Sequence, residues 1–245
     1  MQSDLLYGKP PLSEFSDVDC WIFDLDNTLY PRHVDLFKQM EVKMNEFVSR
    51  LLDLETEKAS QLRHDYYIKY GTTMRGLMVE HHIQPDDFLE FVHDIDHSRV
   101  PPDPLLAEGI RQLPGKRYIL TNGTQDHAEK VAARLGITGL FHDIFDIVWA
   151  DLDPKPNRAP YDKLLAQTGL APRRAAMFED LPRNLKIPHE LGMKTILVVP
   201  SHTRDVFHEN WEAGAEETSH VQFITESLGE FLKDMRLSVS EADRR

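Results

Sequence analysis

Two aspartates separated by one residue follow a short apolar segment near the start of the chain. Asp24 and Asp26 come directly after residues 18–23, and Leu25 lies between them. On an extended chain, residues two apart point the same way, so both carboxylates can converge on one site while Leu25 turns into the core. Two close carboxylates repel each other, which raises the proton affinity of one of them unless a cation intervenes. The pair suits a division of labour in which one carboxylate attacks phosphorus and the other carries a proton for the leaving group.

Two further segments have the composition of a phosphate site. Thr121, Asn122 and Gly123 follow a second apolar segment and precede a predicted helix. A hydroxyl group followed by backbone amides in a glycine-containing turn, just before a helix, can cradle a phosphate. Lys155, fixed by the adjacent Pro156, can neutralise both a phosphate and the attacking carboxylate.

Glu179 and Asp180 end a third apolar segment. Together with Asp24 they offer hard oxygen ligands of the kind that suits Mg²⁺. Taken singly, each cluster has a simpler interpretation, namely a solvated turn, a helix cap or a solvated lysine. All four clusters fall, in order, at or just beyond the predicted ends of strands, which is the edge where parallel α/β sheets bind ligands. The four together therefore favour one shared site.

Short apolar segments rich in branched residues alternate with helical stretches along most of the chain, which predicts a parallel sheet covered by helices on both faces. The predicted strands are residues 18–23, 117–120, 175–178, 195–199 and 221–224. The predicted helices between them are residues 124–135, 161–168 and 185–191, the last of them kinked or irregular because it contains Pro188. The expected fold is α/β, a Rossmann-like doubly wound parallel sheet.

The segment between the first two predicted strands differs from the rest because it has helical periodicity and no convincing strand. A stiff proline-rich connector, residues 101–104, closes it. We predict an inserted all-helical cap domain. The expected division is a core of residues 14–31 and 103–237, a cap of residues 32–102, and terminal extensions of residues 1–13 and 238–245.

Composition excludes some classes of partner and location. Hydrophobic residues make up 41% of the chain and charged residues 28%, which is typical of a globular protein. The formal net charge of −13 repels nucleic acid but does not exclude a small phosphorylated substrate, because a metal ion and a few cations can reverse the potential locally. Cys20, the single cysteine, predicts a buried structural thiol and a reducing compartment. With no apparent signal peptide or membrane segment, we expect a cytoplasmic protein.

At this point the motifs resemble those of a known family. Phe23-Asp24-Leu25-Asp26-Asn27-Thr28-Leu29-Tyr30 closely resembles the first motif of haloacid-dehalogenase-superfamily phosphatases. The other three motifs of that superfamily are similar to Thr121-Asn122-Gly123, to Lys155-Pro156, and to Phe178-Glu179-Asp180 with Asn184. The resemblance spans about residues 18–199, and the predicted helical insertion corresponds to the cap of one subfamily.

The resemblance implies a role for each matched residue. Asp24 would attack phosphorus, and Asp26 would act as general acid and then as base toward water. Asp24 and Asp180, with the backbone carbonyl of Asp26, would hold Mg²⁺, and Glu179 would support that metal site. Thr121 and Lys155 would bind the transferring phosphoryl group. Asn27 and Asn122, which lie inside the first two motifs, are predicted substrate contacts.

Residues 27–31 and 151–156 resemble the pyrimidine 5′-nucleotidase branch of the superfamily, which hydrolyses nucleoside monophosphates such as UMP and CMP. Asp26 disfavours a carbon–halogen substrate, because true dehalogenases of the superfamily lack that second acid. The alternatives are a phosphatase for phosphoglycolate or a sugar phosphate, a phosphomutase, or a binding module without catalysis. The acids and the lysine of the four motifs count against the last of these.

Several residues of the predicted cap are candidates for choosing the substrate. An aromatic and basic cluster could stack on a base or could equally pack between cap helices; it comprises Tyr66, Tyr67, Tyr70, Met74 and Arg75. Arg99, near the connector back to the core, is the preferred candidate for a further substrate contact. A histidine metal site at His81, His82 or His97 is not expected, because no acids lie at ligand spacing. The sequence leaves the oligomeric state open.

Overall fold

In the described part of the chain, seven parallel strands form one sheet in the order β1-β7-β6-β5-β2-β3-β4. The computed structural model describes residues 6–7, 14–200 and 218–242. The strands are β1 (Leu6–Tyr7), β2 (Cys20–Phe23), β3 (Lys116–Leu120), β4 (Asp143–Phe145), β5 (Ala175–Glu179), β6 (Lys194–Val198) and β7 (Phe223–Thr225). The five predicted strands are confirmed as β2, β3, β5, β6 and β7, and the prediction missed β1 and β4. Strand β2 is central, paired with β3 on one side and β5 on the other.

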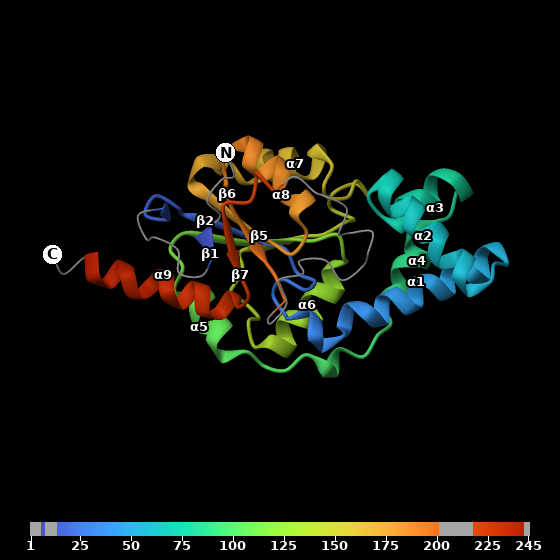
Figure 1. The fold of residues 1–245 in the computed structure, drawn as a ribbon, viewed down its shortest axis with the longest axis horizontal. Coiled ribbons are helices and arrows are strands. Elements are labelled where there is room, and N and C mark those ends of the chain that lie inside the picture. Colours follow the sequence, from blue (N-terminus) through green and yellow to red (C-terminus); the bar gives the residue numbers. More distant parts are fainter. Residues whose placement is uncertain (1–5, 8–13, 201–217, 243–245) are drawn as a thin grey trace.

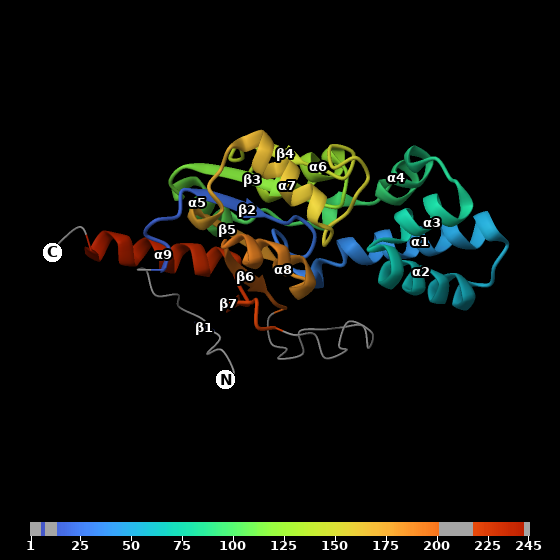
Figure 2. The same cartoon turned by 90° about the horizontal axis from the view of Figure 1, so that it is seen from above.

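Successive side chains of each strand point to opposite faces of the sheet, and both faces are covered. On one face, Trp21 and Phe23 of β2 pack with Phe178 of β5 in a core that also includes residues of α5 (Pro104–Gln112), α6 (Gln125–Leu135) and α9 (Leu228–Ala242). On the other, Cys20 and Ile22 join residues of α7 (Arg158–Thr168) and α8 (Pro182–Leu191). Figure 1 shows these two helical layers on either side of the sheet, and Figure 2 shows the molecule from the side of α7 and α8. This arrangement confirms the predicted doubly wound α/β fold.

Helix α8 differs from the prediction because it runs through Pro188 as one helix and begins earlier, at Pro182. Proline has no backbone N–H, so the carbonyl of Asn184 loses its helical partner. The hydroxyl of Tyr161, on α7, donates a hydrogen bond of 2.7 Å to that carbonyl. A neighbouring helix therefore satisfies the group that Pro188 leaves without a partner, and the helix continues.

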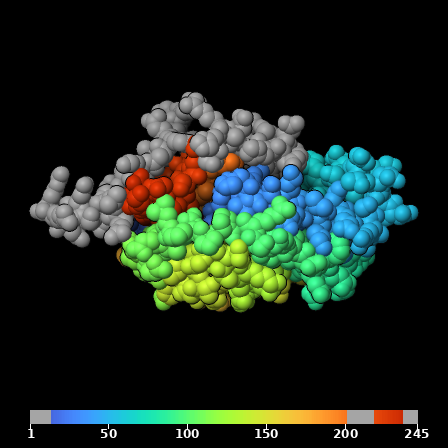
Figure 3. All heavy atoms as spheres, turned by 90° about the horizontal axis from the view of Figure 1, so that it is seen from below, coloured from blue at the N-terminus to red at the C-terminus, as the bar shows by residue number. Residues whose placement is uncertain are grey.

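Between β2 and α5 the elements are all helices, as predicted, and α1 to α4 lie at one end of the molecule (Figures 1 and 3). The elements are η2 (Arg32–Val34), α1 (Leu36–Leu52), α2 (Thr56–Tyr70), α3 (Thr73–His81), α4 (Pro85–His93) and η3 (His97–Arg99). Helices α1 to α4 share a hydrophobic core of their own, which includes Met40, Val48, Leu77 and Phe88. Ile147, from the loop after β4, belongs to the same cluster, so the helical block packs on the sheet part of the chain.

Two other expectations concern burial and membranes. Cys20 is buried and free, as predicted, and burial, with a smaller contribution from Asp19, raises the pKa of its thiol to about 12. A thiol with so high a pKa is almost wholly protonated near neutral pH, which agrees with a structural residue. Within the described residues, none of the helices combines the length and the apolar character needed to cross a membrane.

Candidate active site

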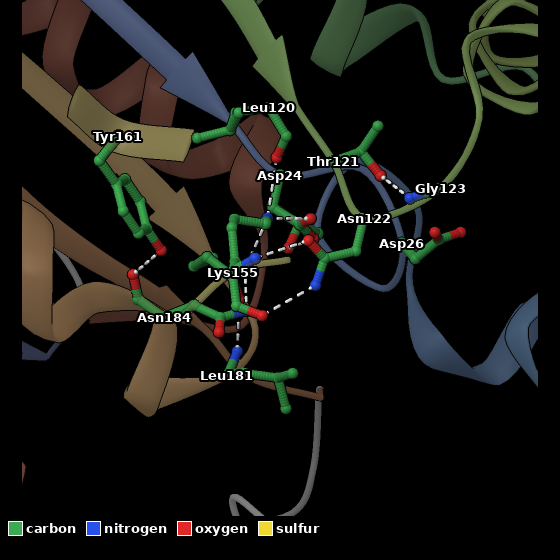
Figure 4. Close-up of polar contacts among 12 residues, drawn as sticks. Asp24, Asp26, Leu120, Thr121, Asn122, Gly123, Lys155, Tyr161, Leu181 and Asn184 are labelled. Carbon is green, nitrogen blue, oxygen red and sulfur yellow. Dashed lines mark hydrogen bonds and ion pairs between the residues drawn. The ribbon is translucent and has the colours of Figure 1, made fainter. Parts of the chain in front are cut away.

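The predicted polar clusters meet at the carboxyl edge of the sheet. Asp24 follows β2, Thr121 follows β3, and Asp180 follows β5. Because β2 lies between β3 and β5, the side chains at these three strand ends are neighbours in space. All of them line one cavity of about 820 Å³, which extends from the sheet edge to helices α1 and α2. Lys155, from the loop before α7, lines the same cavity. Figure 4 shows Lys155 among its polar contacts with Asp24, Leu120 and Asn122.

Lys155 is the centre of the hydrogen-bonded network, with only 1% of its surface exposed. Its ammonium group donates to Asp24 Oδ1 at 2.7 Å, to the carbonyl of Leu120 at 2.8 Å and to Glu179 Oε1 at 2.9 Å. Burial lowers the pKa of this lysine, but the carboxylates of Asp24 and Glu179 raise it by more, and the net shift is upward. The lysine therefore stays charged beside Asp24.

Asn122 fixes the loop that carries Lys155. Its side-chain oxygen accepts a hydrogen bond from the backbone N–H of Lys155 at 2.9 Å, and its amide nitrogen donates to the backbone carbonyl of Lys155 at 3.1 Å. The peptide bond between Lys155 and Pro156 is cis. Both ends of the Asn122 amide are thus engaged with Lys155, and the contact between Asn122 and a substrate stays a prediction.

Asp24 is 6% exposed and is held on both carboxylate oxygens. Oδ1 accepts from Lys155, and Oδ2 accepts from the hydroxyl of Thr28 at 2.9 Å. Burial raises the pKa of Asp24, Lys155 lowers it, and the nearby carboxylates of Glu179 and Asp26 raise it, for a net upward shift. Lys155 thus partly offsets the cost of burying a carboxylate among other carboxylates.

Asp26 has a different environment. Its Oδ1 accepts a hydrogen bond of 2.5 Å from the hydroxyl of Tyr30 and lies 2.9 Å from Nε2 of His127. Burial raises the pKa of Asp26, but His127 and Tyr30 lower it by more, so the net shift is downward. The sequence analysis singled out neither partner. His127 could have been found, since it shares the buried face of its helix with Val131 and Leu135.

Three acids lie close enough together to hold a metal ion. Asp24, Glu179 and Asp180 each offer a carboxylate oxygen, and these oxygens all lie within 4.8 Å of one another. Glu179 is already committed to protein donors, because Oε2 accepts from the N–H of Leu181 at 2.7 Å and Oε1 accepts from the amide of Asn184 at 2.6 Å. An all-oxygen donor set suits a hard cation.

Thr121 and Gly123 shape the space beside Asp26. The N–H of Gly123 donates to Thr121 Oγ1 at 2.9 Å. A Cβ added to Gly123 would lie 3.3 Å from that hydroxyl oxygen and 3.6 Å from Asp26 Oδ2. The backbone at Gly123 therefore lies close against the hydroxyl of Thr121 and the carboxylate of Asp26, and a side chain there would be crowded. Asn27, in the left-handed conformation at φ 59°, lines the same cavity and is buried.

Only part of the predicted aromatic and basic cluster faces this cavity. Tyr67 and Met74 line it, whereas Tyr66 donates to or accepts from His81 Nε2 at 2.6 Å. Neither Tyr66, Tyr70 nor Arg75 is among the lining residues described. Arg99 is exposed on η3 and does not line the described cavity, so the structure does not bring this candidate to the site.

The analysis of the sequence missed three arginines in the cavity wall, Arg32, Arg63 and Arg183, because the motifs do not include them. Arg183, on α8, lies over the ring of Tyr67 with 3.6 Å between its guanidinium carbon and the ring centroid. It also donates to the carbonyl of Gly71 at 3.3 Å. Gly71 itself packs against Pro154, which precedes Lys155. These contacts join the helical block to the loop and helix that surround the acids.

A curated yeast protein is similar to this chain over most of its length. The chain is 27% identical to Phosphate metabolism protein 8 of Saccharomyces cerevisiae over 195 residues, which is 72% of this chain and 60% of the yeast protein. The chain thus spans less than two thirds of the length of that curated relative.

Solved structures share the fold at low identity. L-2-haloacid dehalogenase from Xanthobacter autotrophicus is 17% identical with a TM-score of 0.56, covering 89% of this chain and 98% of the dehalogenase. CbbY from Rhodobacter sphaeroides, solved in complex with phosphate, is 16% identical with a TM-score of 0.60, covering 89% of this chain and 99% of CbbY.

The sequence pattern of one family covers most of the chain. The pattern of haloacid dehalogenase-like hydrolases matches residues 18–192, a span that begins before Asp24 and ends after Asp180. It therefore contains all four clusters that meet at the sheet edge. The chain belongs to the haloacid dehalogenase-like hydrolase family.

Proposed function

We propose that this protein hydrolyses phosphate monoesters through a covalent phosphate on Asp24. The proposal rests on the different partners of two neighbouring carboxylates. Asp24 accepts a hydrogen bond from the buried ammonium of Lys155, whereas Asp26 contacts Tyr30 and His127. One carboxylate is paired with a cation that can also contact a phosphoryl group, and the other lines the cavity beside Thr121 and Gly123. This is the division of labour that nucleophilic displacement with acid catalysis requires.

In the proposed first step, a carboxylate oxygen of Asp24 attacks phosphorus and the ester P–O bond breaks. Asp26, which its neighbours keep ionised in the free protein, takes up a proton as the anionic substrate binds beside it, since a nearby negative charge favours the neutral acid. It gives this proton to the departing alcohol oxygen and is left as a carboxylate. In the second step Asp26 takes a proton from water as the water oxygen attacks phosphorus, which releases inorganic phosphate and restores Asp24. Thr121 and Lys155 would hold the phosphoryl oxygens throughout.

We propose Mg²⁺ as the cofactor, held by Asp24 and Asp180 with the backbone carbonyl of Asp26, and with Glu179 as support. The close group of carboxylate oxygens supports this assignment. Bound there, the ion would supply charge neutralisation for the phosphoryl oxygens.

For the substrate we propose a pyrimidine nucleoside monophosphate. A cavity of about 820 Å³ is within the usual range of roughly 300–1,000 Å³ for small-molecule sites. Its far wall offers an aromatic ring, Tyr67, and amide side chains such as Asn45 and Gln61, which suit a planar polar base. The name of the yeast relative and the phosphate complex of CbbY agree with phosphate chemistry in general.

The proposal includes the domain division and the location expected from the sequence. Residues 14–31 and 103–237 would form the core and residues 32–102 the cap, in a cytoplasmic protein. The substrate would be a small phosphorylated molecule and not a nucleic acid polymer, because the chain carries a net charge of −13.

The likeness to L-2-haloacid dehalogenase makes carbon–halogen cleavage a second candidate, since attack by a carboxylate is common to both reactions. A halide leaves without a proton, so that reaction has no use for the second acid, Asp26. Release of chloride from an L-2-haloacid by the purified protein, without phosphate release from any ester, would favour the second candidate.

The experiment that tests the proposal measures inorganic phosphate released from UMP, CMP, AMP, phosphoglycolate and glucose phosphates, with Mg²⁺ and with EDTA. Magnesium-dependent turnover of UMP or CMP, abolished by Asp24→Asn, would support the mechanism and the nucleotide substrate. Turnover of another ester alone would retain the mechanism and discard the pyrimidine nucleotide. No turnover of any ester by folded protein would count against the whole proposal.

A further inference from the structure

A chain of hydrogen-bonded histidines leads away from Asp26 toward the protein surface. Nε2 of His127 lies 2.9 Å from Asp26 Oδ1, and Nδ1 of the same ring lies 2.9 Å from Nε2 of His97. His97 ends the chain, with Nδ1 lying 3.1 Å from the carbonyl of Ile95. His127 has no exposed surface and His97 is half-buried.

The direction of the chain follows from its last member. A carbonyl oxygen can only accept a hydrogen bond, so Nδ1 of His97 is the donor to Ile95. The Nε2 atom of a neutral His97 is then an acceptor, and Nδ1 of His127 donates to it. For Nε2 of the same ring to donate to Asp26 as well, His127 must carry a hydrogen on both nitrogens, as an imidazolium. The ring of His127 is thereby fixed with Nε2 toward Asp26. A ring anchored on both sides cannot turn without breaking a buried hydrogen bond.

The same contacts decide which oxygen of Asp26 is free to react. Tyr30 and His127 both contact Oδ1. No hydrogen bond to Oδ2 comes from the described residues, and Asp26 lines the cavity together with Gly123. The hydroxyl of Thr121, which is a proposed phosphoryl contact, lines the same part of the cavity and accepts from the N–H of Gly123.

We propose that His127, held in place by His97, is a positioning residue that fixes Oδ1 of Asp26 and thereby presents Oδ2 to the leaving-group oxygen. This inference rests on the proposed phosphatase reaction. In the first step the proton on Oδ2 passes to the alcohol oxygen as the ester P–O bond breaks, and Oδ1 keeps its contacts with Tyr30 and His127. His127 touches neither the phosphate nor the alcohol; it acts through Asp26.

The chain also joins three separate parts of the fold. His127 is in the first turn of α6, His97 is in η3 on the way back from the helical block, and η3 packs against α6. His93, at the end of α4, lines the cavity, and its ring centroid is 4.9 Å from that of His127. The orientation of the general acid therefore depends on residues that close the helical insertion.

The leaving group offers a test that separates this role from simple packing. An alkyl phosphate such as UMP releases an alkoxide, which needs a proton, whereas 4-nitrophenyl phosphate releases a phenolate that is stable without one. Loss of a well-placed acid therefore slows the first ester much more than the second. The ratio of the two kcat/KM values reports the step in which the ester bond breaks, and it does not depend on the fraction of enzyme that is correctly folded.

The variants are His127→Leu, which removes the donor, and His127→Gln, which keeps an N–H at the end of the side chain. We expect His127→Leu to lower kcat/KM for UMP, or for the best alkyl ester of the panel, by about 10- to 100-fold, and for 4-nitrophenyl phosphate by less than about threefold. His127→Gln should recover part of the difference. His97→Gln should shift the ratio in the same direction by roughly two- to fivefold, because the ring of His127 would lose one anchor.

Val131→Ala is the matched control, since Val131 is buried on the same face of α6 one turn further on and does not contact Asp26. It should lower the melting temperature and leave the ratio unchanged. Equal losses for both esters in His127→Leu and in His97→Gln would overturn the inference while leaving the phosphatase intact. A wild-type protein inactive on every ester, or an active Asp24→Asn variant, would instead overturn the proposed function.

Discussion

The floor and the far wall of the cavity are built in different ways. At the floor, Asp24, Lys155 and Glu179 are buried and each is bound to another by hydrogen bonds of 2.7 to 2.9 Å. At the far wall, α1 and α2 contribute half-buried side chains such as Tyr67 and Asn45, together with apolar ones such as Met44. In the proposed function, a few charged groups at the floor carry out the reaction, whereas many side chains on helices together select the substrate. Changes at the floor should abolish the reaction, and changes at the wall should redirect it.

The largest effect is expected for Lys155→Met. Without the ammonium group, the buried carboxylates of Asp24 and Glu179 face each other unpaired, which costs about 3–5 kcal/mol of unfolding free energy. We also expect kcat to fall by at least about 10³-fold, because two anions would have to meet without a cation. Chemical denaturation and phosphate release measure the two quantities. Arg158→Met, which breaks only an exposed ion pair with Asp162, is the control and should change neither by much.

A smaller effect than that of Lys155→Met is expected for Asp180→Asn, which should weaken binding of the proposed metal ion without preventing it. EDTA should abolish phosphate release, and added Mg²⁺ should restore it. With one carboxylate ligand lost, Asp180→Asn should need about 10- to 100-fold more Mg²⁺ for half-maximal activity. A Mg²⁺ titration of activity and of the melting temperature checks this. An unchanged titration curve would remove Asp180 from the metal site.

At the wall, Arg183→Ala should raise KM by about tenfold with less than about threefold change in kcat, because it removes the cation over Tyr67 and the donor to Gly71. The substrate would then meet a wall that is less well held, while the acids stay in place. Steady-state kinetics on the best ester of the panel measures both constants. Tyr70→Phe, outside the described cavity lining, should leave both nearly unchanged. A fall in kcat with unchanged KM would instead mean that Arg183 acts in the reaction and not in substrate binding.

The smallest effect on activity concerns His93, whose response should appear in stability. Burial, with a further contribution from His127, lowers the pKa of His93 to about 4. The unfolded chain, with a histidine pKa near about 6.5, binds the proton first, so stability is full above that pH and falls as the pH drops toward 4. The contribution of this residue to the loss is about 3 kcal/mol at most. His93→Gln should therefore give a shallower dependence of unfolding free energy between pH 6.5 and 4, as measured by urea denaturation. Identical slopes would contradict the shift.

Features of the fold and the site that depend on residues close together in the sequence could be predicted, whereas contacts between distant parts of the chain could not. The central strands were predictable because each is a continuous apolar segment, whereas β4 has only one buried residue, Phe145, and β1 has only two residues. Three of the four motifs were predictable because their polar residues directly follow strands, whereas Lys155, in the loop between β4 and α7, was identified from the adjacent Pro156 and from the resemblance. The family match agrees with that assignment, although it does not test the role of any residue.

The partners of these motifs were harder to predict because they come from distant parts of the chain. Arg183 and Tyr67 are 116 positions apart, and only the folded chain stacks one on the other. Arg99 is close in sequence to the connector, yet η3 directs it to the surface. His127 lies between these two cases. Its burial could be predicted, because it is on the same helix face as Val131 and Leu135, but its contact with Asp26 could not.

The proline in α8 has a consequence for how the site is assembled. Its helix carries Asn184, whose side chain holds Glu179 and whose carbonyl is bound by Tyr161 from α7. Taken out of the protein, residues 182–191 would be a poor helix, with one carbonyl open to water and a ring where an N–H should be. We expect the segment to form a complete helix only when Tyr161 of α7 is packed against it. Tyr161→Phe should therefore weaken the contacts of Lys155 indirectly, through Asn184 and Glu179. The position of Lys155 thus depends on α7, α8 and β5 together.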